Sequence, residues 1–235
     1  MTAVKFEPEH RGVLRLKTEP YGISVLGATL RYIPCTGPCR LLVMAAIHGE
    51  EPETTFLLSR ALRAYASPFK SIAFVLCANP DGVALGTRGN ANGVDLNRNF
   101  PTSNWAADPV ASRSVLEAPR DTLLSPGDFK GGEPEIQALV ALVQKLKPSA
   151  ILSMHSPIGC VDAPRQTPLV LDLQKVFRLP WVENIGYPTP GSLGTWCMEQ
   201  GLECVTLELP RLALELLFER YGEPFAEFLE NADIK

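Results

Sequence analysis

Short apolar runs alternate with segments of helical periodicity along most of this chain, and no other feature constrains the fold as strongly. The apolar runs have the length of strands, and in the segments between them apolar residues recur every three or four positions. Such alternation predicts an α/β domain whose sheet is covered by helices on both faces. We expect strands at 40–47, 71–78, 149–155 and 202–209, and helices at 51–66, 131–146, 191–201 and 210–232.

Two segments depart from this pattern. Residues 101–130 are rich in Pro, Ser, Asp and Gly and lack periodicity, so we expect a long functional loop; whether it is a mobile lid is left open. The C-terminal helical segment contains Gly222 and Pro224, where we expect an interruption. We find no repeat and no linker, so a single domain over residues 1–235 is expected.

Composition argues against several classes of protein. The net charge of −4 is mild and dispersed, which gives no support to binding of nucleic acid or of a membrane surface. We see no bilayer-spanning apolar segment and no secretory signal, so the cytosol is the expected compartment. The scattered cysteines are expected to be reduced thiols. Cys35 and Cys39 could form half of a zinc site, but no second close pair follows.

Three polar residues stand at or near the ends of predicted strands. His48 follows the run at 40–47, His155 ends the third strand, and Glu208 lies near the end of the last one. In open α/β sheets, ligands bind beyond the carboxyl ends of the strands. These residues therefore predict a site at that edge of the sheet.

His48 and Glu51 have a spacing that suits a metal site. Catalytic zinc sites use three protein ligands, often two His and one Glu, and keep a fourth position open for water. Only His10 and His155 could supply the second imidazole, and we favour His155 because it ends an apolar strand. Alternatively, His48 is a buried core residue or a catalytic base, since an isolated His-x-x-Glu pair is common.

The segment 79–101 is dense in Asn, Gly, Asp and Arg. Its Asn-Pro-Asp-Gly start is good turn chemistry, so a plain turn-rich loop is one interpretation. Arg88 and Arg98 favour another, because arginine grips carboxylates through two parallel hydrogen bonds. Beside a metal, two guanidinium groups suit an anionic substrate.

Together, five motifs in this order resemble those of the zinc carboxypeptidase family. They span residues 45–210 and are His48-x-x-Glu51, Asn79-Pro-Asp-Gly82, Gly93-Val-Asp-Leu-Asn97-Arg98-Asn-Phe-Pro101, Ser153-Met-His155-Ser and Thr206-Leu-Glu208-Leu-Pro. The resemblance implies a three-layer α/β/α sandwich around a mixed, largely parallel twisted sheet. It also implies one Zn²⁺ per chain, held by His48, Glu51 and His155.

The resemblance implies roles for further residues. Glu208 matches the general base that moves a proton from water to the leaving amine; otherwise it caps the turn before Pro210. Arg88 matches the arginine that stabilises the developing oxyanion. Asn97 and Arg98 match the pair that binds the terminal carboxylate of the substrate.

Two assignments in the site are less direct. The family carries a mobile tyrosine about twenty residues before the general base, and Tyr187 is the tyrosine in that window. We expect Tyr187 to cap the substrate, or otherwise to anchor its loop. Asp95 is expected to orient the arginine-containing loop rather than to contact substrate.

Within the family, the segment at 186–196 most resembles amidases that cleave the γ-D-glutamyl–meso-diaminopimelate bond of recycled cell-wall peptide. The expected partner is then the small peptide L-Ala-γ-D-Glu-meso-diaminopimelate, whose leaving residue carries a free α-carboxylate. Its distal end adds an ammonium and a second carboxylate. Asp162 and Arg165 follow His155 closely and could bind these charges, although a surface turn at Pro164 is an equal alternative.

Other functions remain open at this point. A carboxypeptidase acting on ordinary peptides and an N-acyl amino acid deacylase share zinc ligands of this type. A zinc-binding module without catalysis is a further alternative, although ligands, base and both arginines are present. We expect a monomer or homodimer.

Overall fold

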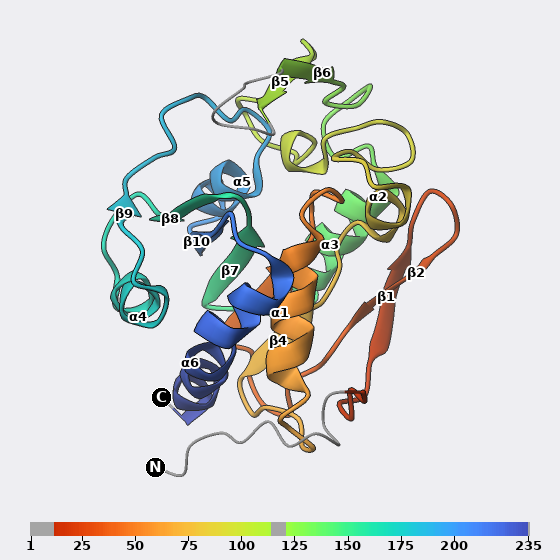
Figure 1. Cartoon of the computed structure of the whole chain (residues 1–235). Coiled ribbons are helices and arrows are strands. Elements are labelled where there is room, and N and C mark those ends of the chain that lie inside the picture. The colour runs from red at the N-terminus through yellow and green to blue at the C-terminus, as the bar shows by residue number, and fades with distance from the viewer. Residues whose placement is uncertain (1–11, 114–120, 235) are drawn as a thin grey trace.

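A six-stranded sheet forms the centre of the molecule (Figure 1). The computed structural model describes residues 12–113 and 121–234. The strand order is β4-β3-β7-β10-β8-β9, and all neighbours are parallel except β10 and β8. The strands are β3 (Leu41–Ala45), β4 (Ile72–Val75), β7 (Ala150–His155), β8 (Ile158–Asp162), β9 (Trp181–Val182) and β10 (Glu203–Pro210).

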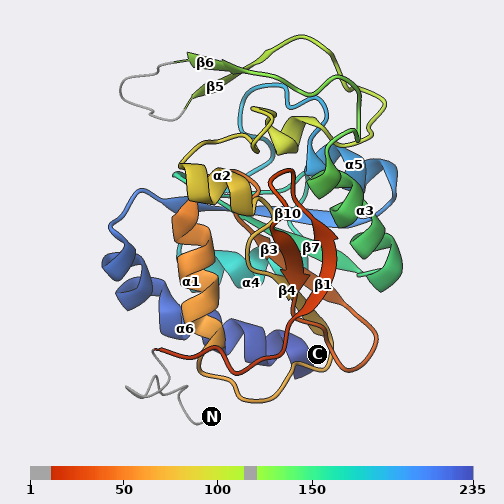
Figure 2. The ribbon, with the colours of Figure 1, turned by 90° about the vertical axis from the view of Figure 1, so that its right-hand side faces the viewer.

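Helices cover both faces of this sheet, as Figure 2 shows. One face packs against α1 (Pro52–Leu62), α4 (Pro168–Phe177) and α6 (Leu214–Ile234). The other packs against α3 (Pro134–Leu146) and α5 (Leu193–Glu199), and the hairpin of β1 (Glu19–Ile23) and β2 (Thr29–Tyr32) lies beside α3. The predicted three-layer α/β/α sandwich with a mixed, largely parallel sheet is confirmed.

The central strands are buried along their whole length because helices cover both of their faces. Every residue of β3, β4 and β7 is buried, which explains their continuous apolar sequences. Leu152 in β7 is fully buried within the cluster beneath α1 and α6. Truncating such a side chain to Ala typically costs about 2–5 kcal/mol, so this core holds the strand ends rigidly in place.

Local sequence determines where several helices begin. α1, α3 and α4 each have proline in the first turn, where the missing N–H costs no intrahelical hydrogen bond. The side chain of Thr167 accepts a hydrogen bond from the N–H of Val170 and so caps α4. In the short helix α2 (Pro80–Leu85), Asn79 accepts from the N–H of Gly82 in the same way.

The structure differs from the sequence-based expectations in several segments. α6 continues through Pro224, because the buried side chains of Tyr221, Phe225 and Leu229 hold the helix against the core despite the lost hydrogen bond. Residues 101–130 include an antiparallel pair, β5 (Val110–Arg113) and β6 (Asp121–Leu124). Six further α-helices and β-strands were not predicted from the sequence: β1, β2, α2, β8, α4 and β9.

Residues 114–120, within the expected loop, lie outside the described residues. Among the helices of the described ranges, none is both long and apolar enough to cross a membrane.

Candidate metal centre and active site

His48 and Glu51 lie in the turn that joins β3 to α1. Ala46, just beyond β3, has a φ of 50°, and this left-handed residue turns the chain at the edge of the sheet. The hydroxyl of Thr54 accepts from the N–H of Ala46 and donates to the carbonyl of Glu51, which closes the turn. Glu51 is the residue before α1 but does not cap it, so its carboxylate is left to the site.

His48, Glu51 and His155 meet at the carboxyl edge of the sheet. Nδ1 of His48 lies 2.7 Å from Oε1 of Glu51, and Nδ1 of His155 lies 3.2 Å from Oε2. One nitrogen or oxygen atom from each residue falls within 4.8 Å of the others, and all three residues are buried. They are the one such group of possible metal ligands among the described residues.

The surroundings of the two imidazoles fit a metal ion. Nδ1 and Nε2 of His48 both face carboxylates, Glu51 at 2.7 Å and Asp95 at 3.2 Å. A neutral imidazole has one proton for these two acceptors, so the other nitrogen needs a cation, either a second proton or a metal ion. With the proton on Nε2, towards Asp95, Nδ1 keeps its lone pair for a metal ion held together with Glu51. In addition, Oε2 of Glu51 is buried and receives no hydrogen bond. Two imidazole nitrogens and a carboxylate form a donor set that suits zinc.

Electrostatics support the same conclusion. Burial by itself raises the pKa of Glu51, but the charges of His48 and His155 outweigh it and hold that pKa well below its usual value. Burial by itself lowers the pKa of His48, yet Glu51 and Asp95 leave it raised. The site of His48, Glu51 and His155 therefore favours positive charge next to Glu51. Protons on the imidazoles supply this charge when a metal ion does not.

Asp95 connects three parts of the site. It is almost fully buried, and it contacts Nε2 of His48 through one oxygen and Nε of Arg88, at 3.0 Å, through the other. It also accepts from the N–H of Asn97, which caps the 3₁₀ turn at Leu96–Arg98. Asp95 therefore orients the loop, as predicted, and the same carboxylate also holds His48 and Arg88.

Replacing Asp95 with Asn is expected to weaken zinc binding by about 10–100-fold, the usual loss when the outer partner of a ligating histidine is removed. The amide keeps the shape but lacks the charge that fixes the proton on Nε2 of His48. Competition with a chelator measures the affinity. Asp81→Asn is the matched control, since Asp81 is equally buried but contacts Ser24 and the N–H of Leu26. Equal zinc affinity in the two variants would contradict this role.

Glu208 lies beside His155 on the neighbouring strand. β10 pairs with β7 so that Glu208 is directly opposite His155, and its Oε2 accepts from the N–H of Ile158 at 3.4 Å. Burial raises the pKa of Glu208 to about 7, although the charge of His155 opposes the shift. A buried carboxyl with a pKa near neutrality can both take and return a proton.

Two arginines face the same region from the loop after α2. Nη1 of Arg88 lies 3.3 Å from Glu50 and 3.5 Å from Glu51. Arg98 is buried; its Nη1 donates to the carbonyl of Asn97, while its Nε has no hydrogen-bond partner. A buried guanidinium with an unpaired N–H suits an anionic ligand. The side-chain oxygen of Asn97 accepts from the N–H of Leu193, which joins this loop to α5.

Tyr187 is half-exposed on the loop that precedes α5. Burial of its hydroxyl raises the pKa of Tyr187, while Arg98 and Arg88 lower it, so the phenol lies within range of both guanidinium groups. Gly191 fixes the end of this loop. Its φ is 72°, and a Cβ there would lie 2.2 Å from the carbonyl oxygen of Arg98.

The remaining predicted residues are more dispersed. Asp162 lies in β8 opposite Thr206, and burial raises its pKa to about 6. Arg165 is exposed on the turn after β8 and forms no ion pair among the described residues. His10, the rejected ligand, lies outside the described residues.

Sequence reasoning missed three residues that support the site. Ser153 lies 3.1 Å from Nε2 of His155, and its position two residues earlier on the same strand face could have indicated this contact. Glu50 contacts Arg88, but nothing local predicts a pairing between residues so far apart. Gly191 could have been suspected only as a turn glycine.

Comparison with known proteins gives consistent matches. A family model described as zinc carboxypeptidase matches residues 36–159. Murein peptide amidase A of Escherichia coli (strain K12) is 42% identical over 223 residues, which cover 93% of this chain and 92% of that protein. The enzyme of the same name from Vibrio campbellii is 40% identical over 224 residues, which cover 94% and 90%.

Solved structures extend this comparison. The crystal structure of a murein-tripeptide amidase from Escherichia coli O157 matches with a TM-score of 0.92 and 40% identity, covering 97% of this chain and 98% of that one. A carboxypeptidase A from Helicoverpa armigera matches with a TM-score of 0.66 and 16% identity, covering 94% and 69%. The second likeness concerns the fold alone.

Proposed function

Because the chain belongs to the zinc carboxypeptidase family, we propose that it is a zinc hydrolase that cleaves the γ-D-glutamyl–meso-diaminopimelate amide bond of murein tripeptide. The observation that carries this proposal is the cluster of His48, Glu51 and His155 with Glu208 beside it, in a chain so similar to murein peptide amidases. The bond is that of a carboxypeptidase substrate, because the leaving residue carries a free α-carboxylate next to the cleaved amide.

Zinc is the cofactor of this family, and we assign its three protein ligands to His48, Glu51 and His155. When bound, Zn²⁺ activates water and polarises the scissile carbonyl. Asp95 and Ser153 hold the outer nitrogens of the two imidazoles, so each ring presents Nδ1 to the centre. These contacts fix the orientation of both rings.

Glu208 acts as the general base in this proposal. Its carboxylate takes a proton from the attacking water and passes it to the nitrogen of the leaving diaminopimelate. Arg88 is the cation that faces the developing oxyanion. Asp95 and Glu50 hold its guanidinium in place, so little reorganisation is needed as charge develops.

Asn97, Arg98 and Tyr187 bind the substrate in this proposal. Arg98 has an unpaired, buried Nε–H, which supports binding of the terminal carboxylate of diaminopimelate. Asn97 is fixed by α5 through its side-chain oxygen and keeps its amide N–H₂ for the same carboxylate. The charges of Arg98 and Arg88 both lower the pKa of Tyr187, which supports a place for this phenol beside the bound peptide.

Strand register supports a role for Asp162 in recognising the distal end of diaminopimelate. Glu208 pairs with His155, and two residues earlier Thr206 pairs with both Ser153 and Asp162. Side chains two residues apart on a strand point to the same face of the sheet. Asp162 therefore lies on the same face as Glu208 and His155, roughly 6–7 Å further from the carboxyl edge. A long side chain that leaves the metal along this face brings its ammonium towards the Asp162 carboxylate.

Replacing Asp162 with Asn is expected to remove the preference for diaminopimelate over norleucine in the leaving position. Loss of a hydrogen bond between charged groups costs about 1.5–3 kcal/mol, which is about 10–100-fold in kcat/KM. Norleucine has no distal charge, so its hydrolysis should change little. A similar fall for both substrates would instead make Asp162 a structural residue.

The same interaction should depend on pH. Because the pKa of Asp162 is raised to about 6, its carboxylate is increasingly protonated as the pH falls below that value. The preference for diaminopimelate should therefore decline below about pH 6 in the wild type, while the Asn variant should show no such change.

Hydrolysis rates on three substrates test the proposed function. Murein tripeptide, an ordinary peptide with a C-terminal L-amino acid, and an N-acyl amino acid are compared at equal enzyme and zinc. We expect the highest kcat/KM on the tripeptide. A higher value on one of the others would identify an ordinary carboxypeptidase or a deacylase, and stoichiometric zinc without any hydrolysis would favour a non-catalytic binding module.

We also propose that residues 1–235 form one catalytic domain, that it works in the cytosol, where recycled cell-wall peptides are processed, and that it is a monomer or homodimer. The sedimentation velocity of the purified protein distinguishes the last two. Fractionation of cells that express the native chain tests the compartment.

A further inference from the structure

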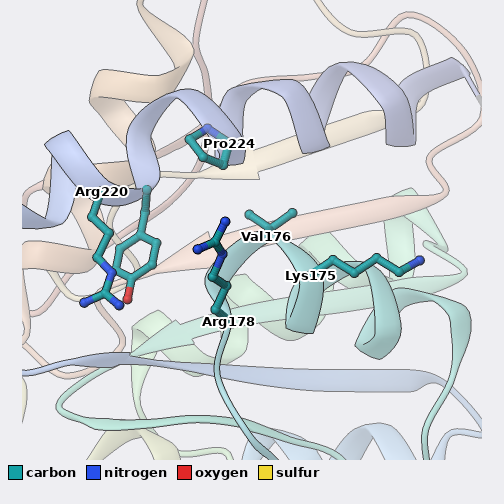
Figure 3. A pocket seen from close by; sticks show the side chains of 6 residues that line it. Lys175, Val176, Arg178, Arg220 and Pro224 are labelled. Atoms are coloured by element: carbon teal, nitrogen blue, oxygen red, sulfur yellow. The ribbon is translucent and has the colours of Figure 1, made fainter.

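A pocket lies on the helical layer of α1, α4 and α6, and none of its lining residues contacts the proposed metal ligands (Figure 3). It has a volume of about 280 Å³ and is formed where the end of α4 meets the middle of α6. Its lining comprises Lys175, Val176, Arg178, Arg220, Tyr221 and Pro224. None of these residues belongs to the proposed site, and half of them are cations.

The two arginines lack counter-charges. Neither Arg178 nor Arg220 forms an ion pair with any described residue, although Glu219 and Glu223 flank Arg220 in the sequence. Lys175 differs, because its Nζ lies 3.7 Å from the carboxylate of Asp172. A doubly charged anion bound between the two guanidinium groups would be attracted by both.

Both arginines have exposed side chains; the backbone places Arg178 at the pocket, and an aromatic contact orients Arg220. Arg178 ends α4 with a φ of 53°, and Figure 3 shows its guanidinium reaching from there towards α6. The guanidinium carbon of Arg220 lies 5.4 Å from the ring centroid of Tyr221, whose own ring is buried. Such contact with an aromatic ring orients the guanidinium and limits its freedom.

The rest of the lining is apolar. Val176 projects from α4 and Pro224 from α6, so one wall of the pocket offers hydrocarbon surface rather than hydrogen-bond donors (Figure 3). A bare inorganic anion would leave that wall without a partner. An anion attached to a small ring or chain would use both parts of the pocket.

We propose that this pocket binds a phosphate monoester, with the phosphate between Arg178 and Arg220 and the organic group against Val176 and Pro224. Arginine is suited to this task because its planar fork donates two parallel hydrogen bonds to phosphate oxygens. The site is separate from the metal centre, so this proposal does not depend on the proposed hydrolytic function.

Isothermal titration calorimetry of the full chain with phenyl phosphate and with inorganic phosphate, at constant ionic strength, tests the proposal. We expect phenyl phosphate to bind more tightly than inorganic phosphate. The variant R178Q/R220Q should lose about tenfold or more in affinity for each removed arginine, as charge-assisted hydrogen bonds imply. The control R31Q/R40Q removes the same charge from two exposed residues outside the pocket and should bind as the wild type does.

Two results would overturn the proposal. Equal loss of affinity in R178Q/R220Q and R31Q/R40Q would mean that only the net charge of the protein matters. Equal affinity for phenyl phosphate and inorganic phosphate would mean that the organic group makes no contact with the pocket. The single variant R178Q, at an exposed position, provides the same comparison if the double variant does not fold. Circular dichroism and unchanged hydrolysis of murein tripeptide establish that each variant is folded.

Discussion

Replacing Glu208 with Gln is expected to lower kcat for murein tripeptide by about 10³-fold while zinc content remains unchanged. The amide has the size of the carboxylate but cannot accept a proton, and general acid–base catalysis typically contributes 10²–10⁴-fold. Zinc is retained because Glu208 lies outside the ligand cluster of His48, Glu51 and His155. Steady-state kinetics and metal analysis of the same preparation measure both quantities.

The pH profile gives a second readout of this role. The pKa of Glu208 is raised to about 7 without metal, and a nearby Zn²⁺ favours the carboxylate and lowers it. Only the ionised form accepts a proton, so kcat/KM of the wild type should rise with pH and level off at or below about pH 7. The residual kcat/KM of the Gln variant should not show this rise with pH.

Glu203→Gln is the matched control for this variant, because Glu203 lies at the opposite end of the same strand. It should keep normal turnover. A Glu208→Gln enzyme with wild-type kcat, or one that had lost its zinc, would remove Glu208 from the role of general base.

Replacing Glu51 with Gln is expected to weaken zinc binding by more than about 100-fold, the upper end of the loss seen when only an outer partner of a ligand is removed. The variant loses the negative charge that both imidazoles face. With zinc at about 1,000 times its wild-type Kd, the metal stabilises the wild type by about 4 kcal/mol but the variant by at most about 1.4 kcal/mol. Thermal unfolding with and without zinc measures the difference.

Glu53→Gln is the control here, because Glu53 lies two residues further along α1 and bonds Ser156 rather than an imidazole. Its zinc-dependent stabilisation should match that of the wild type. If Glu51→Gln kept the full stabilisation, the metal would have to be held by other residues.

The local parts of this molecule follow from its sequence. The strand β3 and the helix α1 are readable as an apolar run followed by an amphipathic segment with Pro52 in its first turn. Their junction carries His48 and Glu51 three residues apart, so one turn sets the separation of the pair. The third ligand could be chosen only because His155 ends an apolar strand.

Other parts could not be read in this way. The helix α6 passes through Pro224 because core packing outweighs one missing hydrogen bond, a balance that local propensity cannot express. The antiparallel strand β8 has no strong periodicity of its own. It forms because it hydrogen-bonds to β10, and this pairing places Asp162 on the same sheet face as Glu208.

The sequence by itself determined the alternation of strands and helices, the local metal-binding pair and the chemistry of each side chain, because these depend on residues only a few positions apart. Only the tertiary structure decided that one carboxylate, Asp95, serves both His48 and Arg88, and that Arg178 and Arg220 share a pocket. His48 and Asp95 are 47 positions apart in the sequence, and Arg178 and Arg220 are 42 apart. Packing of the layers, rather than local preference, brings them together.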